Sequence, residues 1–463
     1  MELIIDFSGL PVDTPWSFAW WLFTHGAFVI FILVGLVLWF ELWLINRRHE
    51  YEHGVAYVLL AIDVPKSTEQ TPMPVESIFS SLAATYSTGT LYDRLWKGRV
   101  QENFSFEIVS LGGYIQYLIR TPAMFRDLIE AAIYAQYPDA EITQVEDYVN
   151  RIPVDYNTEA YDVWGTEFEL MNKEAYPIKT YPEFEHTLSQ SFKDPMASLL
   201  EVLSRIQPDE DVWMQWLVTP TNDHWKHHAQ QEVKAIIEGK SHQKQGFIDY
   251  LIFKLPLKVL DDIGEIILPL WGEEGGEKKE TELGTVSKLS PGQKKVVEAI
   301  EHKMSKIGLY TKFRMIYWGQ RETFLKGRGV NAVVGAIQQF TAMDRNGFKP
   351  SKSMTTKAEY FLKDSRITRK QRRILNHYRS RNPHRGLGHG FILSTEELAT
   401  LYHFPVVEVK APLVKKTEVK KSEPPFALPT PGSYLKPVGD SNISTPDVSI
   451  KGQAPTNLPF VDE

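Results

Sequence analysis

The chain has 463 residues, of which 43% are hydrophobic and 24% charged, so it is long and apolar enough to bury the cores of two or three domains. It contains no cysteine, which excludes disulfide bonds and thiolate metal sites. The net charge of -7 is unevenly placed, because the range 345–385 holds 13 Lys and Arg against two carboxylates. We expect this range either to meet an anionic partner or to be a solvated, partly flexible stretch.

The first predicted element is a membrane-spanning helix in the range 16–45, preceded by an extracytoplasmic tail, 1–15. The stretch from Phe18 to Phe40 has 23 residues, interrupted only by one threonine, one histidine and two glycines. At ~1.5 Å per residue this stretch can cross a hydrocarbon core of ~30 Å. Because Arg47-Arg48 follows directly, the positive-inside rule places the N-terminus outside and the later domains in the cytoplasm. We therefore expect a single-pass protein of the cell (inner) membrane, in contact with the lipid bilayer.

A first α+β domain is predicted over residues 50–150. An apolar strand precedes an amphipathic helix, and two strands of alternating hydrophobicity follow, joined by a tight turn at Gly112-Gly113. Thr121-Pro122 opens a second helix, and a weaker strand over 139–148 ends the domain. The order β-α-β-β-α-β is that of the ferredoxin-like, split βαβ arrangement.

A second α+β domain is predicted over residues 160–405, and its elements repeat those of the first. We therefore expect an α+β protein with two ferredoxin-like (split βαβ) cytoplasmic units related by structural duplication. The second domain includes a basic segment, 345–389, and an insertion, 239–289. This insertion either docks on the membrane or a partner helix, or packs on its own domain. A disordered tail rich in Lys and Pro, 406–463, follows.

No catalytic constellation stands out. The only GK[ST] sequence, Gly239-Lys240-Ser241, lacks the leading glycine of a phosphate-binding P-loop and follows a predicted helix rather than a strand. His224 and His228 stand four residues apart on that helix, a spacing that can hold a divalent metal ion if a third ligand comes from elsewhere. A solvated helix start explains the same histidines. We therefore expect a protein that is not an enzyme, has no cofactor and, these weak candidates aside, binds no metal.

The basic segment is the clearest candidate for binding. Its cations could contact several phosphates, with His377 and Tyr378 as stacking groups, and binding would be weakly selective and salt-sensitive. The alternative is docking onto an acidic protein or a membrane surface. The candidate residues are Arg366, Arg369, Lys370, Arg372, Arg373, Arg379, Arg381 and Arg385.

The stretch FILSTEELATLYHFP, 391–405, predicts a strand end followed by a short capped helix. Ser394 and Glu397 have the spacing of a capping box, in which each side chain bonds the other residue's amide. Leu398, Leu401 and Tyr402 share one helical face. This helix either seals the end of the domain or serves as a partner surface.

The anchor, the stretch LLAIDVPKSTEQTPMPVESIFSSL and the capped helix before an EPPFALP linker resemble a bacterial family. It is the N-terminal membrane-anchored region of small-genome (candidate phyla) bacterial proteins related to type IV secretion coupling proteins and conjugative ATPases. Its members commonly continue into an ATPase domain, which is missing from this sequence. The resemblance implies a membrane-anchored, homo-oligomeric platform of a secretion or conjugation-like apparatus that docks a separate ATPase. The alternative is a membrane-tethered, weakly selective protein that binds DNA or other nucleic acid through 345–385.

Overall fold

The computed structural model describes residues 28–65, 71–153, 156, 159–184, 194–239, 289–383 and 389–405, with the single residues 14, 17 and 21. The chain divides into two compact units, 1–418 and 419–463, and every described residue belongs to the first. The predicted tail, nearly all of the insertion 239–289, and Arg385 lie outside the described residues.

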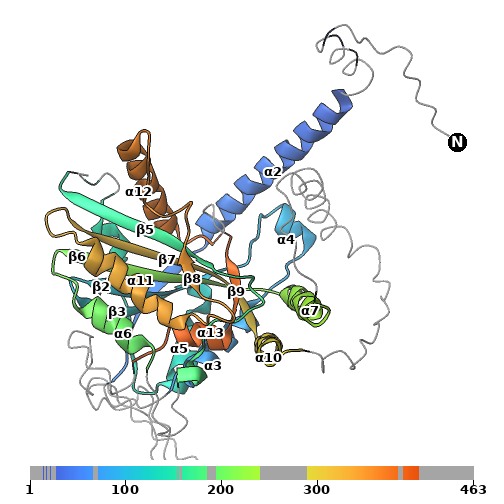
Figure 1. The fold of residues 1–463 in the computed structure, drawn as a ribbon. Coiled ribbons are helices and arrows are strands. Elements are labelled where there is room, and N and C mark those ends of the chain that lie inside the picture. The colour runs from blue at the N-terminus through green and yellow to red at the C-terminus, as the bar shows by residue number, and fades with distance from the viewer. Residues whose placement is uncertain are drawn as a thin grey trace, which may run out of the picture. The chain divides into compact units, whose positions relative to one another are not determined.

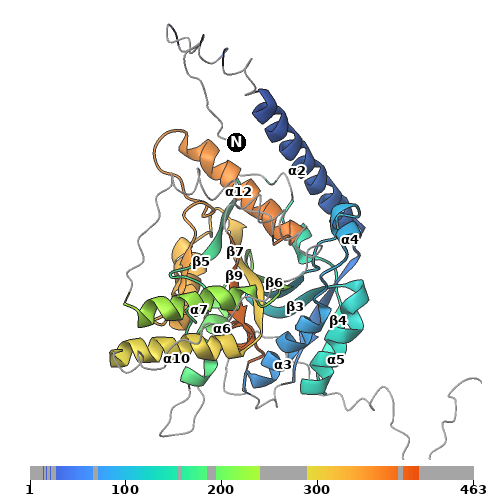
Figure 2. The same cartoon turned by 90° about the vertical axis from the view of Figure 1, so that its right-hand side faces the viewer.

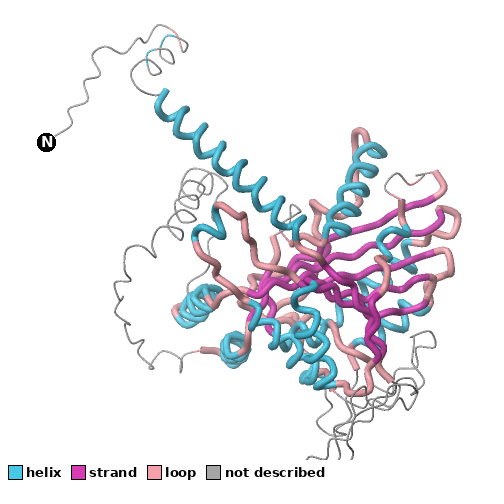
Figure 3. Tube along the Cα trace, turned by 180° about the vertical axis from the view of Figure 1, so that it is seen from behind, coloured by secondary structure: helices cyan, strands magenta, loops and turns pink. Residues whose placement is uncertain are grey.

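The described part is a mixed α/β fold built on one antiparallel sheet of nine strands (Figure 1). The strands are β1 (Tyr57–Asp63), β2 (Phe104–Leu111), β3 (Tyr114–Pro122), β4 (Glu141–Gln144), β5 (Tyr161–Leu170), β6 (Glu210–Pro220), β7 (Gly308–Gln320), β8 (Phe348–Pro350) and β9 (Phe391–Ser394). Eight of them follow the order β4-β1-β3-β2-β6-β7-β5-β8, and β9 pairs with β7. Figure 3 shows these strands from behind as one continuous layer.

The helices around the sheet are numbered as in Figure 1. They include α2 (Phe28–Gly54), α3 (Met73–Leu82), α4 (Leu91–Leu95), α5 (Arg126–Gln136), α6 (Met196–Ser204), α7 (His224–Ile237), α10 (Pro291–Ser305), α11 (Ala332–Ile337), α12 (Lys363–Ser380) and α13 (Thr395–Leu401).

The two predicted domains share this sheet instead of forming separate units. In each half the strands follow the order of a split βαβ arrangement, β4-β1-β3-β2 in the first and β6-β7-β5-β8 in the second. The halves join where β2 pairs with β6, from Phe104 opposite Val218 to Leu111 opposite Asp211. Both strands are buried along almost their whole length. Two free edges this apolar would be prone to pair with other chains, and their mutual pairing removes both.

Helices cover the two faces of the sheet unequally. The larger apolar core lies under α3, α5, α6, α11 and α13, with α3 packed on α5 and on α13 (Figure 2). A smaller core on the opposite face lies under α12, whose Leu375 and Tyr378 meet Trp213 of β6. A third core holds α7 and α10 together, side by side in Figure 2.

The helix α2 corrects the prediction of a membrane-spanning segment. Among the residues that the structure describes, no helix is long and apolar enough to cross a membrane. The uninterrupted apolar part of α2 ends at Phe40, and Glu41 and Arg47-Arg48 follow within the same helix. The predicted transmembrane helix at 16–45, the single-pass topology and the inner-membrane location are therefore wrong.

Candidate functional site

The predicted basic residues separate into a buried set and an exposed set along α12. Arg381, directly after the helix, is only 1% exposed and takes a left-handed backbone conformation, with φ of 47°. Its guanidinium lies 2.7 Å from Glu107 Oε1 and 2.6 Å from Asp147 Oδ2. Because these contacts bury the charge and occupy its donors, Arg381 is a structural residue.

The partners of Arg381 are held by further hydrogen bonds. Glu107, on β2, also accepts bonds from Ser105, from the Tyr148 hydroxyl at 2.7 Å and from the Gln215 amide at 3.0 Å. Burial by itself raises the pKa of Glu107, but the charge and hydrogen bonds of Arg381 outweigh it, so the pKa lies below its ordinary value. Glu107 therefore stays ionised, and this polar cluster fixes the end of α12 to the sheet.

Three other residues of the predicted basic set donate side-chain hydrogen bonds to nearby backbone carbonyls. Arg379 donates to the carbonyls of Ile152 and Pro153. Lys370 Nζ donates to the carbonyls of Thr355 and Lys357 at 3.0 and 2.9 Å. Arg366 donates to the Glu359 carbonyl at 2.9 Å, but its side chain lies on the surface. These bonds tie α12 to the chain that precedes it and to the segment after β4.

The exposed set forms a stripe on the outer side of α12. Arg366, Arg369 and Arg373 follow at spacings of three and four residues, so they share one helical face, and Arg372 lies beside them. The opposite side of the helix is buried against the sheet through Gln371, Ile374, Leu375 and Tyr378. Packing therefore directs these four arginines into solvent.

An exposed aromatic turn begins the same helix, and the sequence analysis missed it. Tyr360, Phe361 and Leu362 are 84%, 90% and 78% exposed. Tyr360 and Leu362 have φ of 68° and 51°, a left-handed conformation that is unfavourable for side chains of this size. The sequence does carry a signal for this turn, since three consecutive apolar residues stand just before the basic run. We call Tyr360, Phe361, Arg366, Arg369, Arg372 and Arg373 the basic-aromatic surface.

The stacking role predicted for Tyr378 is not compatible with its position. Tyr378 is fully buried, and its hydroxyl lies 2.8 Å from that of Tyr148. His377 is partly buried, and its backbone carbonyl accepts a bond from Arg314 at 2.8 Å. Among the described aromatic groups of α12 and the turn before it, Tyr360 and Phe361 are therefore the ones exposed to a ligand.

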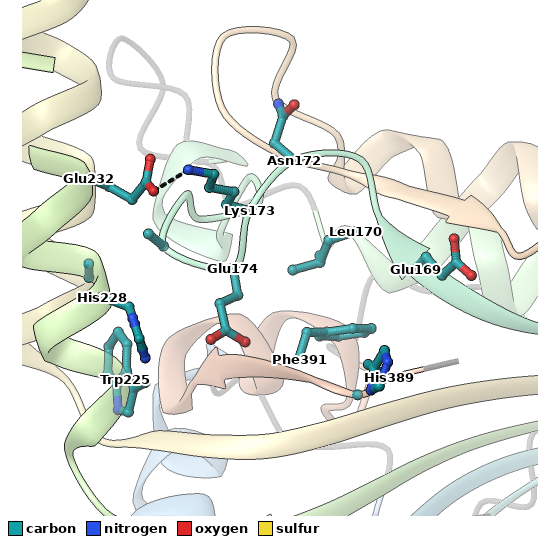
Figure 4. Close-up of a pocket in the computed structure, with 13 residues that line it drawn as sticks. Glu169, Leu170, Asn172, Lys173, Glu174, Trp225, His228, Glu232, His389 and Phe391 are labelled. Atoms are coloured by element: carbon teal, nitrogen blue, oxygen red, sulfur yellow. Dashed lines mark hydrogen bonds and ion pairs between the residues drawn. The ribbon is translucent and has the colours of Figure 1, made fainter. Parts of the chain in front are cut away.

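The two candidate metal ligands, His224 and His228, line different cavities. His228 borders a cavity of about 410 Å³ between α7 and β9, drawn in Figure 4 with Trp225 beside it. In this cavity Lys173 pairs with Glu232, and Glu174 accepts a bond from the Ile392 amide at 3.0 Å. His224 borders another cavity, near α4. Within the described ranges no three His, Asp or Glu side chains converge to hold a metal ion.

The helix α13 is the buried end of the fold. Ser394 and Glu397 form the capping box that their spacing predicts, and all seven residues of α13 are buried. Glu397 pairs at 3.0 Å with Lys303, which is also buried. Tyr402 packs edge-on against the rings of Phe106 and Tyr117. Because α13 seals the core, it offers no exposed face to the ATPase partner that the resemblance implies, and the docking of such a partner stays a prediction.

The comparisons with known proteins give a family and no activity. Residues 64–417, well over half of the chain, match the family described as a domain of unknown function, DUF8128. No curated protein matches the chain. Nothing in the match links the chain to type IV secretion coupling proteins. The chain belongs to the DUF8128 family.

Proposed function

We propose that this protein binds single-stranded nucleic acid through the basic-aromatic surface, without catalysing a reaction. The observation that carries the proposal is a stripe of exposed arginines on α12 together with two exposed aromatic rings in the turn just before this helix. Phosphates attract the guanidinium groups, and unpaired bases can stack on Tyr360 and Phe361. A base within a duplex has no free face for such stacking, so the rings favour a single strand.

The packing of α12 on the sheet holds the basic-aromatic surface in place, which suits a binding role. The buried side of α12 packs on the sheet, and the ion pairs of Arg381 hold the C-terminal end of the helix. The N-terminal end projects away from the sheet in Figure 1. Between Lys357 and Arg373 the sequence holds seven Lys and Arg against two carboxylates, and one of these, Glu359, pairs with Lys357 at 2.8 Å. The surface therefore combines a fixed geometry with a positive potential.

Fluorescence anisotropy of a labelled oligothymidine tests the proposal. We expect the affinity for the single strand to exceed that for a duplex of equal length, and to fall as salt rises from about 50 to about 200 mM. Replacing Arg366, Arg369 and Arg373 by Gln should reduce the slope of log affinity against log salt by about 2, since each phosphate contact on a single strand contributes ~0.7.

A matched control removes the same charge elsewhere. Arg205, directly after α6, and Lys294 and Lys295, on α10, are exposed, and their triple replacement by Gln should leave the salt slope unchanged. Equal binding by the two triple variants would show that α12 is not the site. Failure of the unmodified protein to bind at low salt would remove the function altogether.

A further inference from the structure

A second basic site lies away from α12, in a cavity of about 600 Å³ between the loop that precedes α4 and the start of α7. The loop supplies Tyr86, Ser87 and Thr88, and the other polar lining residues are Arg94, Arg99, Gln101, Asn222 and His224. The cavity shares no residue with the basic-aromatic surface. Its volume is in the range of sites that hold small molecules.

The charge of this cavity is positive. Arg94 and Arg99 line it, and no carboxylate is among the described residues that do so. Two acidic side chains lie close to the loop, and one of them, Glu102, pairs with Arg99. Asp93 accepts bonds from Lys97 at 2.8 Å and from the Thr90 hydroxyl at 2.7 Å. Glu102 accepts a bond from the Tyr51 hydroxyl at 2.7 Å and lies 4.0 Å from Arg99 Nε.

The loop brings the two arginines together around Gly89. This residue has a φ of 57°, and a Cβ added to it would lie 3.8 Å from Arg99 Cδ and 3.9 Å from Arg94 Cγ. Both side-chain stems therefore pass close to the same backbone turn. Arg94 Nε donates to the Thr88 carbonyl at 2.6 Å, which fixes this side chain relative to the loop.

Several donors in the cavity have no partner within the described part of the chain. The terminal guanidinium nitrogens of Arg94, the hydroxyls of Ser87 and Thr88, and the His224 ring form no hydrogen bond to another described residue. Two guanidinium groups that line one cavity together with hydroxyls suit phosphate oxygens, because Arg can bond such groups in a bidentate manner.

We propose that this cavity binds the phosphate groups of a small molecule about the size of a nucleotide. Arg94 and Arg99 contact the phosphate oxygens, and Ser87 and Thr88 add hydroxyl donors. The ring of Tyr86, at the edge of the cavity, covers a base or sugar. The site is independent of the nucleic-acid surface on α12, since the two share no residue.

Isothermal titration calorimetry with inorganic pyrophosphate and with adenosine monophosphate tests this site. We expect both to bind, and Arg99→Gln to weaken both by at least about tenfold, the usual effect of losing a charge-assisted hydrogen bond. Arg205→Gln makes the same replacement at an exposed position directly after α6 and should bind both probes as the unmodified protein does. Equal affinities in Arg99→Gln and Arg205→Gln would overturn the proposal, as would no binding of either probe.

Two further variants distinguish this site from its surroundings. Tyr86→Ala should weaken adenosine monophosphate and spare pyrophosphate; no change for either probe would overturn the role of Tyr86. The triple Gln variant at Arg366, Arg369 and Arg373 should bind pyrophosphate normally. If that variant lost pyrophosphate binding, the phosphate site would belong to α12 and the cavity assignment would be wrong.

Discussion

The two ends of α12 carry the same kind of residue and have opposite roles. At the C-terminal end, Arg381 is enclosed by Glu107 and Asp147 and is almost inaccessible to solvent. Toward the N-terminal end, Arg369 and Arg373 are exposed. The difference shows that the cations of one run stay exposed to solvent only where the fold supplies no carboxylate for them.

The reason for this division lies in the sheet beneath the helix. Glu107 lies on β2 among buried residues and needs a positive partner, because an unpaired buried carboxylate is strongly destabilising. The end of α12 meets this strand through Arg381. The first turns of the helix project past the sheet, where water solvates the charges (Figure 1).

The largest expected effect is on stability and comes from the buried end. Arg381→Met should lower the free energy of unfolding by about 3 to 5 kcal/mol, because Glu107 and Asp147 would lose their main partner. Urea denaturation followed by circular dichroism measures this change. Arg373→Met is the matched control and should stay within about 0.5 kcal/mol of the unmodified protein. Similar losses in the two variants would contradict the comparison between the ends.

Acid should remove part of the same stabilisation. Burial raises the pKa of Glu107 and of Asp147, but Arg381 outweighs it, and both carboxyl pKa values lie below their ordinary values in the folded protein. The unfolded chain therefore binds more protons in acid, so this stability is complete above pH of about 5 and is lost as the pH falls through the folded values.

The measurement is the free energy of unfolding as a function of pH. The Arg381→Met variant lacks the positive charge that lowers the two carboxyl pKa values. The stability of this variant should therefore fall less steeply with acid than that of the unmodified protein. Parallel curves for the two proteins would show that other carboxylates, and not this cluster, determine the acid sensitivity.

Substitutions at the exposed end of α12 should change the free energy of unfolding least, and they should weaken binding. Replacing Tyr360 and Phe361 by Ala should weaken oligothymidine binding by about 1 kcal/mol or more for each ring, since each stacked base contributes ~1–3 kcal/mol. The free energy of unfolding should stay constant, because both rings lie in solvent. Unchanged affinity would limit the surface to phosphate contacts and remove the preference for single strands.

Several local features could be read from the sequence because they depend on neighbouring residues. The capping box at Ser394 is present where the spacing predicts it. The turn at Gly112-Gly113 joins β2 to β3, and both glycines have positive φ, at 59° and 86°. Burial on both sides of β6 also agrees with its apolar composition. Each of these features is decided within a few residues along the chain.

Other features could not be read in this way. The apolar stretch near the N-terminus suggested a membrane span, but the described helix continues through Glu41 and Arg47-Arg48 into the folded part, where the Tyr51 hydroxyl bonds Glu102. The pairing of β2 with β6 merged two expected domains into one sheet. His224 and His228, four residues apart, line separate cavities because other elements surround each of them.

The sequence by itself determined where caps and turns form and where positive charge gathers. Only the tertiary structure decided which of those charges are available to a partner. Arg381 and Glu107 are separated by 274 positions in the chain, and their pairing depends on how α12 crosses β2. The free energy of a charge depends on whether water or a carboxylate surrounds it, and no local pattern specifies that environment.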